Sequence, residues 1–202
     1  APFKEKIQLN CGVVSVERRD DGVVIHDTQG NSARYDQVIF ACHSDQALAL
    51  IQQASAEEKE ILRHFSYQPN RMVLHSDTRF MPKRQNAWAS WVYLSEQKTH
   101  QNTAVSLSYW MNNLQDLPTD KPVFVTLNPA HEPDPNSIYD EHVFDHPVFD
   151  ANAIRMQEKI SDIQGKNRFW FCGAYQRNGF HEDGLASAVN VVERMGIAIP
   201  WK

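Results

Sequence analysis

Two short apolar runs constrain the fold of this chain more than any other feature. Residues 38–41 (Val-Ile-Phe-Ala) and 169–172 (Phe-Trp-Phe-Cys) contain no charged side chain. Uninterrupted runs of this kind are typical of strands that are covered on both faces, as in α/β layers. We therefore expect segments 7–41 and 169–195 to pack together, although they are remote in the sequence.

The middle of the chain predicts an antiparallel sheet in a separate layer. In residues 103–111, the apolar side chains of Val105, Leu107, Tyr109 and Met111 alternate with those of Ser106, Ser108 and Trp110. This is the period of a strand with two different faces. Segments 72–75, 87–93 and 123–127 are also predicted to be strands. The predicted fold class is α+β, a fragment of an α/β domain together with an antiparallel-sheet domain.

Composition narrows the classes of partner and compartment. The chain has 202 residues and a formal net charge of -5, so it has no electrostatic footprint for nucleic acid or an anionic membrane. No apolar run approaches the ~20 residues that span a bilayer. Cys11, Cys42 and Cys172 are odd in number and far apart, which favours a reducing, cytoplasmic location in a bacterial type of protein.

Familiar catalytic and metal-binding motifs are absent. The sequence has no GxGxxG, P-loop, GxSxG or HExxH pattern. His142 and His146 are four residues apart and could share a metal on a helix, but residues 128–147 read as an acidic, proline-containing surface loop. The preferred interpretation is two solvent-facing histidines and no metal site.

The C-terminal third predicts a strand, a loop and a helix in series. The strand ends at Gly173, and a helix is expected to open at Asp183-Gly184-Leu185. Small residues at a helix start let a ligand approach the backbone N–H groups, and the helix dipole there favours negative charge. The alternative is that small residues only allow close packing of the helix on the sheet. Asp183 could likewise relay protons with its neighbours or cap the helix.

Residues 171–188, Phe-Cys-Gly-Ala-Tyr-Gln-Arg-Asn-Gly-Phe-His-Glu-Asp-Gly-Leu-Ala-Ser-Ala, resemble the C-terminal flavin-binding segment of the amine oxidase superfamily. That superfamily includes flavin-containing amine oxidases, protoporphyrinogen oxidase and phytoene desaturases, and a bacterial branch of NAD/FAD-binding oxidoreductases is the most similar. Residues 13–16 and 35–43 resemble further segments that contact the dinucleotide. Segments 81–82, 87–91, 109–112 and 126–129 resemble the substrate domain of that branch.

The resemblance implies a set of FAD contacts. The backbone of Val13 would meet the adenine, and Ala41 would lie near the dinucleotide. Gly173 would approach the pyrophosphate or ribitol, and Gly184 and Leu185, beside Asp183, would face the flavin O2. Family members often have Glu or Asp where this chain has Ala174, so a ribitol contact from that side chain is absent.

The resemblance also implies a division of the chain and a missing part. Residues 1–45 would supply strands of an FAD-binding domain, 46–165 a substrate domain, and 166–202 the return strand and C-terminal helix. Family members begin with a strand–GxGxxG–helix unit that holds the ADP phosphates. We expect that N-terminal half to be missing here, so that FAD binds the intact protein but binds this fragment weakly or not at all.

Four aromatic residues on the predicted middle strands are candidates for a substrate cavity: Trp88, Trp91, Tyr109 and Trp110. An apolar wall of this kind would select a hydrophobic small molecule, although ordinary core packing explains such residues as well. Strand alternation predicts that Trp88 and Trp91 lie on opposite faces. The intact enzyme would oxidise a C–N or C–C bond by hydride transfer to flavin, with catalytic residues unassigned. The rival interpretation is a non-catalytic binding domain that presents the aromatic sheet to a partner.

Overall fold

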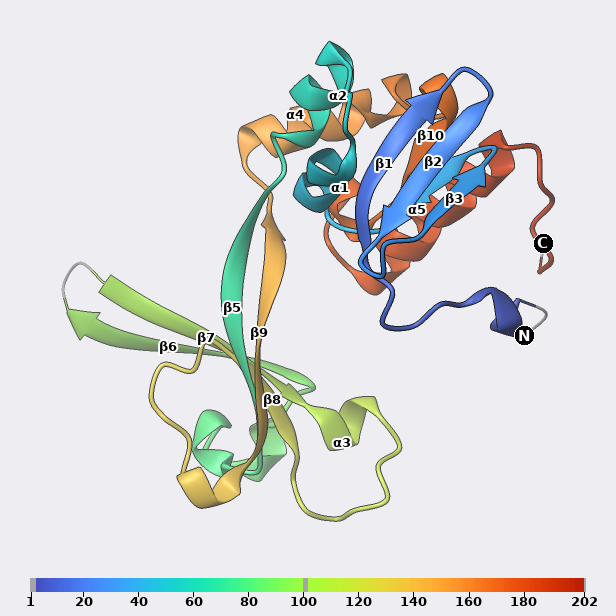
Figure 1. Ribbon diagram of the computed structural model, residues 1–202. Coiled ribbons are helices and arrows are strands. Elements are labelled where there is room, and N and C mark those ends of the chain that lie inside the picture. The colour runs from blue at the N-terminus through green and yellow to red at the C-terminus, as the bar shows by residue number, and fades with distance from the viewer. Residues whose placement is uncertain (1–2, 100–101, 202) are drawn as a thin grey trace. The chain divides into compact units, whose positions relative to one another are not determined.

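The computed structural model in Figure 1 describes residues 3–99 and 102–201 and divides into two compact units. Unit 1 consists of Ala1–Tyr67 and Pro147–Lys202, and unit 2 of Gln68–His146. The division therefore falls at residues 67 and 146 rather than at the expected 45 and 165. The reason is that the helices between residues 44 and 62, and those after residue 150, pack into the core of unit 1.

Unit 1 contains a three-stranded antiparallel meander near its N-terminal end. Its strands pair in the order β1-β2-β3, and the hairpin turn at Asp20-Asp21 leads into a buried Gly22. A Cβ atom on Gly22 would lie 2.8 Å from the carbonyl oxygen of Tyr35, so strand pairing leaves room only for glycine there. The strands are β1 (Val13–Arg19), β2 (Gly22–Asp27) and β3 (Ser32–Tyr35).

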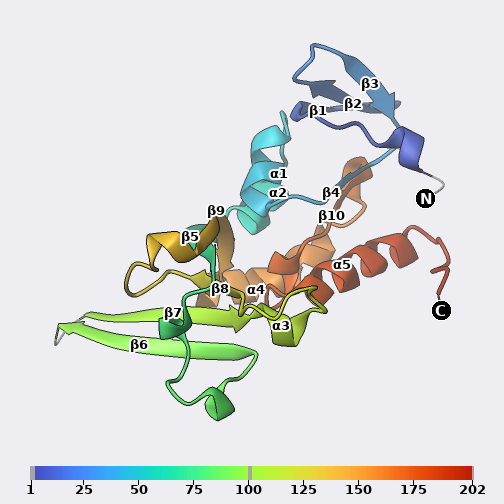
Figure 2. The same ribbon diagram turned by 90° about the horizontal axis from the view of Figure 1, so that it is seen from below.

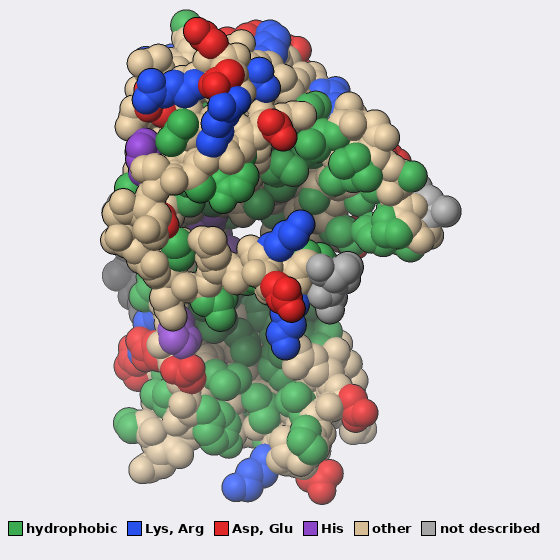
Figure 3. Space-filling model, turned by 45° about the vertical axis from the view of Figure 1, so that its right-hand side comes forward, with side chains coloured by type: hydrophobic (Ala, Val, Ile, Leu, Met, Phe, Trp, Pro, Cys, Tyr) green, Lys and Arg blue, Asp and Glu red, His purple; other side chains and the backbone are tan. Residues whose placement is uncertain are grey.

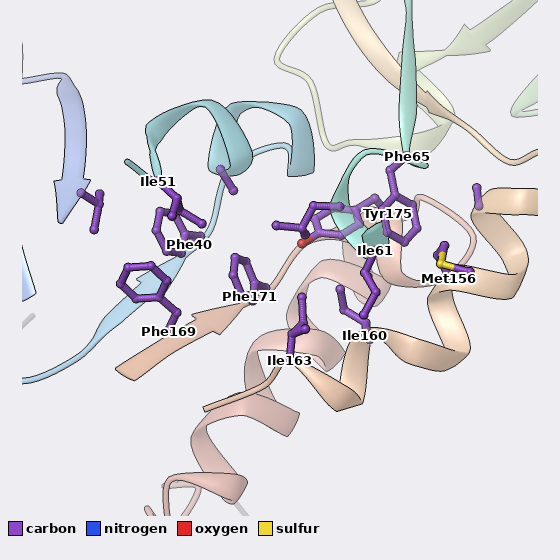
Figure 4. Close-up of a cluster of buried hydrophobic side chains, with 14 of the residues drawn as sticks. Phe40, Ile51, Ile61, Phe65, Met156, Ile160, Ile163, Phe169, Phe171 and Tyr175 are labelled. Carbon is purple, nitrogen blue, oxygen red and sulfur yellow. The ribbon is translucent and has the colours of Figure 1, made fainter. Parts of the chain in front are cut away.

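The two apolar runs form a parallel pair, which confirms the predicted association of remote segments. β4 (Val38–Phe40) pairs with β10 (Phe169–Phe171) in register, with Phe40 opposite Phe171. The ring of Phe40 lies 5.1 Å from that of Phe169 and 5.2 Å from that of Phe171 (Figure 4). The meander and helix α5 (His181–Arg194) lie on opposite sides of this pair (Figure 2).

Two helices of unit 1, α2 (Ala56–Leu62) and α4 (Ala151–Lys159), start at side-chain caps. Ser55 accepts a hydrogen bond from the Glu58 amide, and the Glu58 carboxylate accepts one from the Ser55 amide, which forms a capping box of the Ser-x-x-Glu type. Asp150 accepts hydrogen bonds from the amides of Asn152 and Ala153. Helix α1 (Ser44–Leu50) also belongs to this unit.

The two outer edges of the parallel pair differ. At the β10 edge, Gln164 donates to the Phe171 carbonyl (2.6 Å) and accepts from the Phe171 amide (2.9 Å), as a neighbouring strand would. Gln176 donates to the same carbonyl. Within the described residues, β4 pairs with β10 alone. Ile39 on β4 is 42% exposed, so the expectation of complete cover on both faces is wrong for this strand.

Unit 2 contains a five-stranded sheet in the order β6-β7-β8-β5-β9. The pairs β6–β7, β7–β8 and β8–β5 are antiparallel, and together with the helices they confirm the α+β class. The bounds are β5 (Ser66–His75), β6 (Trp91–Thr99), β7 (Asn102–Trp110), α3 (Met111–Leu114), β8 (Phe124–Leu127) and β9 (Ile138–Val148). None of the described helices has the length and apolar character needed to cross a bilayer.

Two local predictions in unit 2 are wrong. Residues 138–148, read as part of a surface loop, form the edge strand β9 beside β5. The exposed, charged side chains of β9 gave no strand signal because backbone pairing, rather than burial, fixes its conformation. Residues 85–87 form a 3-10 turn, so β6 starts at Trp91 and Trp88 precedes it.

Short 3-10 turns complete the described elements, and several of them connect the strands to the helices. They are η1 (Lys4–Lys6), η2 (Thr78–Phe80), η3 (Gln85–Ala87), η4 (Pro135–Ser137), η5 (Ile160–Asp162), η6 (Lys166–Arg168) and η7 (Ala174–Gln176).

Candidate functional site

The loops that follow β4 and β10 meet at the carboxyl ends of these parallel strands, the edge at which open α/β sheets bind ligands. They enclose a cavity of about 190 Å³ in unit 1. Ala41, Gly173 and Ala174 line it, so three of the predicted cofactor residues are brought together there. Of the remaining lining residues, Cys42 and His43 belong to the resembling segment 35–43 and Tyr175 to segment 171–188, but none of them was singled out as a site residue. Tyr67 and Pro147 had no sequence signal.

A second cavity, of about 400 Å³, opens beside the first one. Val13 and Ala41 both line it, and its walls are almost entirely apolar. Val13 is 40% exposed, and Ala41 is exposed as well, which leaves their backbone accessible to a ligand. Hydrophobic side chains gather on the surface of both units in Figure 3.

The ring of Tyr175 leaves no room for a side chain at Gly173. A Cβ atom at this position would lie 2.6 Å from the Tyr175 ring, so the ring occupies the space that glycine leaves. The Gly173 amide donates to the Ser187 hydroxyl (2.8 Å), and that hydroxyl donates to the Gly184 carbonyl (2.7 Å). Gly173 therefore ties the strand end to α5.

The start of α5 lies two residues earlier than the sequence predicts. The helix begins at His181, and the Gly184 amide already bonds to the Phe180 carbonyl (3.2 Å). The Asp183 carboxylate accepts hydrogen bonds from the amides of Phe180 and Asn178, so Asp183 caps the helix from its third position. The amides left for a ligand are those of the first turn, at His181 and Glu182.

Gly184 packs against the loop rather than facing open space. An added Cβ atom would meet the Ala174 amide nitrogen at 3.8 Å, which is an ordinary van der Waals contact. A small side chain would therefore fit at this position, so packing alone does not require a glycine there. The Leu185 side chain, in contrast, is 48% exposed.

Two aromatic groups give the first cavity a flat wall and a buried donor. The rings of His43 and Tyr67 are stacked at 4.1 Å, and the Tyr67 hydroxyl accepts from the Ser44 amide (2.9 Å). The buried Tyr175 hydroxyl has no hydrogen bond of normal geometry within the described residues. Burial raises the pKa of this phenol, against an opposing interaction with the Gln176 side chain, so it remains a donor.

The thiols at this edge are poor nucleophiles. Burial raises the pKa of Cys42 and also that of Cys172, which directly follows β10. A raised thiol pKa reduces the thiolate fraction at neutral pH. Nothing in this chemistry favours covalent attachment of a ligand at these residues.

These residues fit the apolar parts of a dinucleotide better than its phosphates. The apolar walls, the aromatic stack and the first-turn amides of α5 suit rings and a ribityl chain. Of the described residues that line the two cavities, none is Lys or Arg. A pyrophosphate group would therefore need donors from elsewhere.

The four predicted substrate residues form two pairs on opposite sides of the unit 2 sheet. Trp91 on β6 is paired with Tyr109 on β7, and their rings lie 5.7 Å apart. Trp88 and Trp110 make a perpendicular contact at 5.2 Å. Because neighbouring residues of a strand point to opposite faces, Tyr109 and Trp110 cannot line one wall. Trp88 and Trp91 contact Trp110 and Tyr109 respectively and so lie on opposite faces, although Trp88 precedes β6 and strand alternation does not apply to it.

The Trp91–Tyr109 side is an open apolar face. The register places apolar residues of four strands on it, and Tyr93 is 68% exposed and Trp91 49% exposed. We call this the open face, which consists of Met72, Leu74, Trp91, Tyr93, Leu107, Tyr109, Val125 and Leu127. Such a surface marks a contact with an apolar molecule or protein.

The opposite side, the covered face, is buried and unusually polar. The imidazole of His75 contacts the Thr126 hydroxyl (2.8 Å), which in turn contacts the Ser108 hydroxyl (2.8 Å). Phe80 and Trp88 pack over this row, at 4.8 Å from His75 and 5.6 Å from Phe124 respectively. No cluster of three metal-ligating side chains occurs among the described residues, and His142 pairs with Asp140 instead.

Several solved structures share the fold of this chain at low sequence identity. A fatty acid isomerase from P. acnes described as CLA-producing matches with a TM-score of 0.63 and 14% identity over 93% of this chain and 48% of its own. Reduced UDP-galactopyranose mutase gives 0.61 and 12% over 92% and 47%. Cyclohexylamine oxidase from Brevibacterium oxydans IH-35A gives 0.61 and 12% over 96% and 50%.

The chain thus spans about half the length of these structures. No curated protein sequence matches it significantly. A family model described as flavin containing amine oxidoreductase matches residues 3–146. The match ends before the C-terminal strand, loop and helix, which the structural similarity does cover. Since the match covers more than half of the residues, the chain belongs to the flavin containing amine oxidoreductase family.

Proposed function

We propose that the chain is part of an FAD-dependent oxidoreductase and supplies one wall of its flavin site. The observation that carries this proposal is the meeting of the loops after β4 and β10, within unit 1, around one cavity lined by Ala41, Gly173 and Ala174. When bound, the flavin would accept a hydride from a C–N or C–C bond of the substrate. The residues of this chain would bind and orient it.

The residues of unit 1 that lie at this site have different tasks in the proposal. The exposed backbone at Val13 and Ala41 contacts the adenosine part of the dinucleotide. Ala174 keeps the loop small, and Gly173 fixes it against α5 through Ser187. The amides of His181 and Glu182, rather than those of Gly184 and Leu185, donate to the flavin edge that gains negative charge on reduction.

We further propose that β4 accepts a parallel strand from a segment that also carries the GxGxxG loop. The Cys172 amide donates to the Phe40 carbonyl (2.9 Å), so the Phe40 backbone faces β10. Groups of the intervening residue Ile39 then face the open edge. A strand there would cover Ile39 and bring phosphate donors that the two cavities lack. The 202-residue chain alone is expected to bind FAD weakly.

The open face of unit 2 is the proposed substrate wall. Its exposed Trp91 and Tyr93 offer aromatic area with few polar atoms, which selects a hydrophobic small molecule. Trp88 and Trp110 belong to the covered face and are removed from this role. The second candidate function is a binding module, which the same exposed face would serve if it packed against a protein.

The helix start provides a test that separates flavin binding from folding. His181 is the first residue of α5, where proline is well tolerated because that amide has no intrahelical acceptor. In a protein completed by the GxGxxG half, His181→Pro should weaken FAD affinity and lower the flavin midpoint potential. Thermal stability should stay unchanged.

His181→Ala is the matched control, because it removes the same side chain but keeps the amide. Flavin fluorescence measures affinity, and dye equilibration measures the potential. If both variants bind FAD like the parent, α5 is not the flavin contact. If the completed protein binds no FAD at all, the binding-module interpretation is the better one.

A further inference from the structure

Unit 2 contains a cavity of about 380 Å³ beside the end of β7. Trp110 ends β7, and the chain then passes through α3 and a loop, residues 115–122, that curves back to β8. Trp110 belongs to the covered face, so the sheet separates this cavity from the open face. The flavin proposal assigns no role to it.

A single side chain holds the loop in place. Asn112 accepts from the Val123 amide (2.7 Å) and donates to the carbonyls of Lys121 (2.9 Å) and Thr119 (3.2 Å). The Lys121 amide donates to the Thr119 hydroxyl. The loop is therefore set before any ligand arrives, which lowers the entropic cost of binding.

Two fixed indoles form the aromatic wall. Trp88 and Trp110 are perpendicular, with ring centroids 5.2 Å apart. The indole N–H of Trp88 donates to the Pro82 carbonyl (2.8 Å), and its ring also contacts Phe124. Indole is the best ring partner for a cation placed over its face.

The electrostatic sign of the cavity is negative. Asp116 and Asp120 line it, and neither carboxylate makes a hydrogen bond or ion pair with another described residue. None of the described residues that line the cavity is Lys, Arg or His. The rest of the lining is neutral, with amide groups from Gln85 and Gln115.

We propose that this cavity binds an organic cation of the alkylammonium class. The cationic head would rest on the Trp88–Trp110 corner, within reach of the Asp116 and Asp120 carboxylates on the loop. An alkylammonium ion is weakly hydrated and can pack directly against an indole face, whereas a metal ion would have to give up tightly bound water, so the combination favours the organic ion. The site binds without reaction and does not depend on flavin chemistry.

The test compares choline with its uncharged isostere 3,3-dimethylbutan-1-ol, by NMR titration of the 202-residue chain. Choline should shift the indole N–H signals of Trp88 and Trp110 and leave that of Trp91 in place. The neutral isostere should bind at least about fivefold more weakly, which corresponds to about 1 kcal/mol of cation–π and charge attraction.

Variants then assign the charge. Asp116→Asn and Asp120→Asn should each weaken choline binding severalfold, while Asp145→Asn, an exposed carboxylate on β9, should not. All three variants should keep the indole spectrum of the parent, which shows that the fold is intact. Equal affinity for choline and the isostere, or equal loss in all three variants, would overturn the proposal.

Discussion

Each unit leaves one side of a sheet open, but the groups that are left open differ in kind. In unit 1 the side chains of Gln164 and Gln176 close the β10 edge, whereas the β4 edge presents backbone amides and carbonyls. The unit 2 sheet also ends in edge strands, β6 and β9, but what sets it apart is an exposed aromatic face. Directional hydrogen bonds at an edge recruit another strand, whereas a face recruits apolar area of any kind. We therefore propose a strand partner at the β4 edge and an apolar partner, either a small molecule or a protein, at the open face of unit 2.

The largest expected effect contrasts the two faces of the unit 2 sheet. Trp88→Ala on the covered face removes ring contacts with Trp110 and Phe124 and a hydrogen bond to Pro82. It should lower the free energy of unfolding by about 3 kcal/mol. Trp91→Ala on the open face, where half of the side chain is exposed, should cost less than about 1 kcal/mol. Urea denaturation of both variants measures the difference, and equal losses would mean that the open face is also part of the core.

Acid should weaken the covered face in a pH window set by one histidine. The Asp77 amide donates to Nδ1 of His75, so Nε2 carries the proton that bonds to Thr126. Burial lowers the pKa of His75 from 6.5 to about 4, and the nearby His131 acts in the same direction while Asp77 opposes it. The unfolded chain therefore takes up a proton below pH 6.5 that the folded chain refuses.

This stabilising contribution is complete above pH 6.5 and is lost as the pH falls toward 4, by about 3 kcal/mol in total. Urea unfolding at pH 7, 6 and 5 measures the slope. His75→Gln should flatten it between pH 6.5 and 5, whereas His142→Gln, which changes an exposed histidine on β9, should not. An unchanged slope in His75→Gln would place the titrating group elsewhere.

How far the sequence predicts this molecule depends on where the signal lies. The 38–41 and 169–172 runs and the Ser55–Glu58 box are local patterns, and the structure agrees with them. β9 was missed because its conformation comes from pairing with β5, and no local pattern of its charged residues records that. The start of α5 was misplaced because Asp183 was read as the first residue of the helix. It is in fact the third helical residue, where a carboxylate can also cap the helix by accepting from the amide of the N-cap residue Phe180.

The closed edge of unit 1 should be sensitive to one amide side chain. Gln164→Ala removes the acceptor of the buried Phe171 amide and one of the two donors to the Phe171 carbonyl. The carbonyl keeps its hydrogen bond from Gln176, but the amide is left without an acceptor. The expected loss is about 1–3 kcal/mol in the free energy of unfolding. Gln52→Ala, which removes only an exposed hydrogen bond to Ser15, is the control and should be nearly neutral. Equal effects would mean that the β10 edge is not closed by Gln164.

The smallest effect is expected at Tyr175, which is buried but lacks a normal hydrogen bond within the described residues. Tyr175→Phe removes a donor whose burial has no compensating bond and keeps the ring that Gly173 accommodates. Stability of the 202-residue chain should therefore be unchanged or rise by up to about 1 kcal/mol. If this hydroxyl donates to a flavin in the completed protein, the same variant should weaken FAD affinity there. A clear loss of stability in the isolated chain would instead show that Gln176 already satisfies the phenol, and would remove Tyr175 from the proposed site.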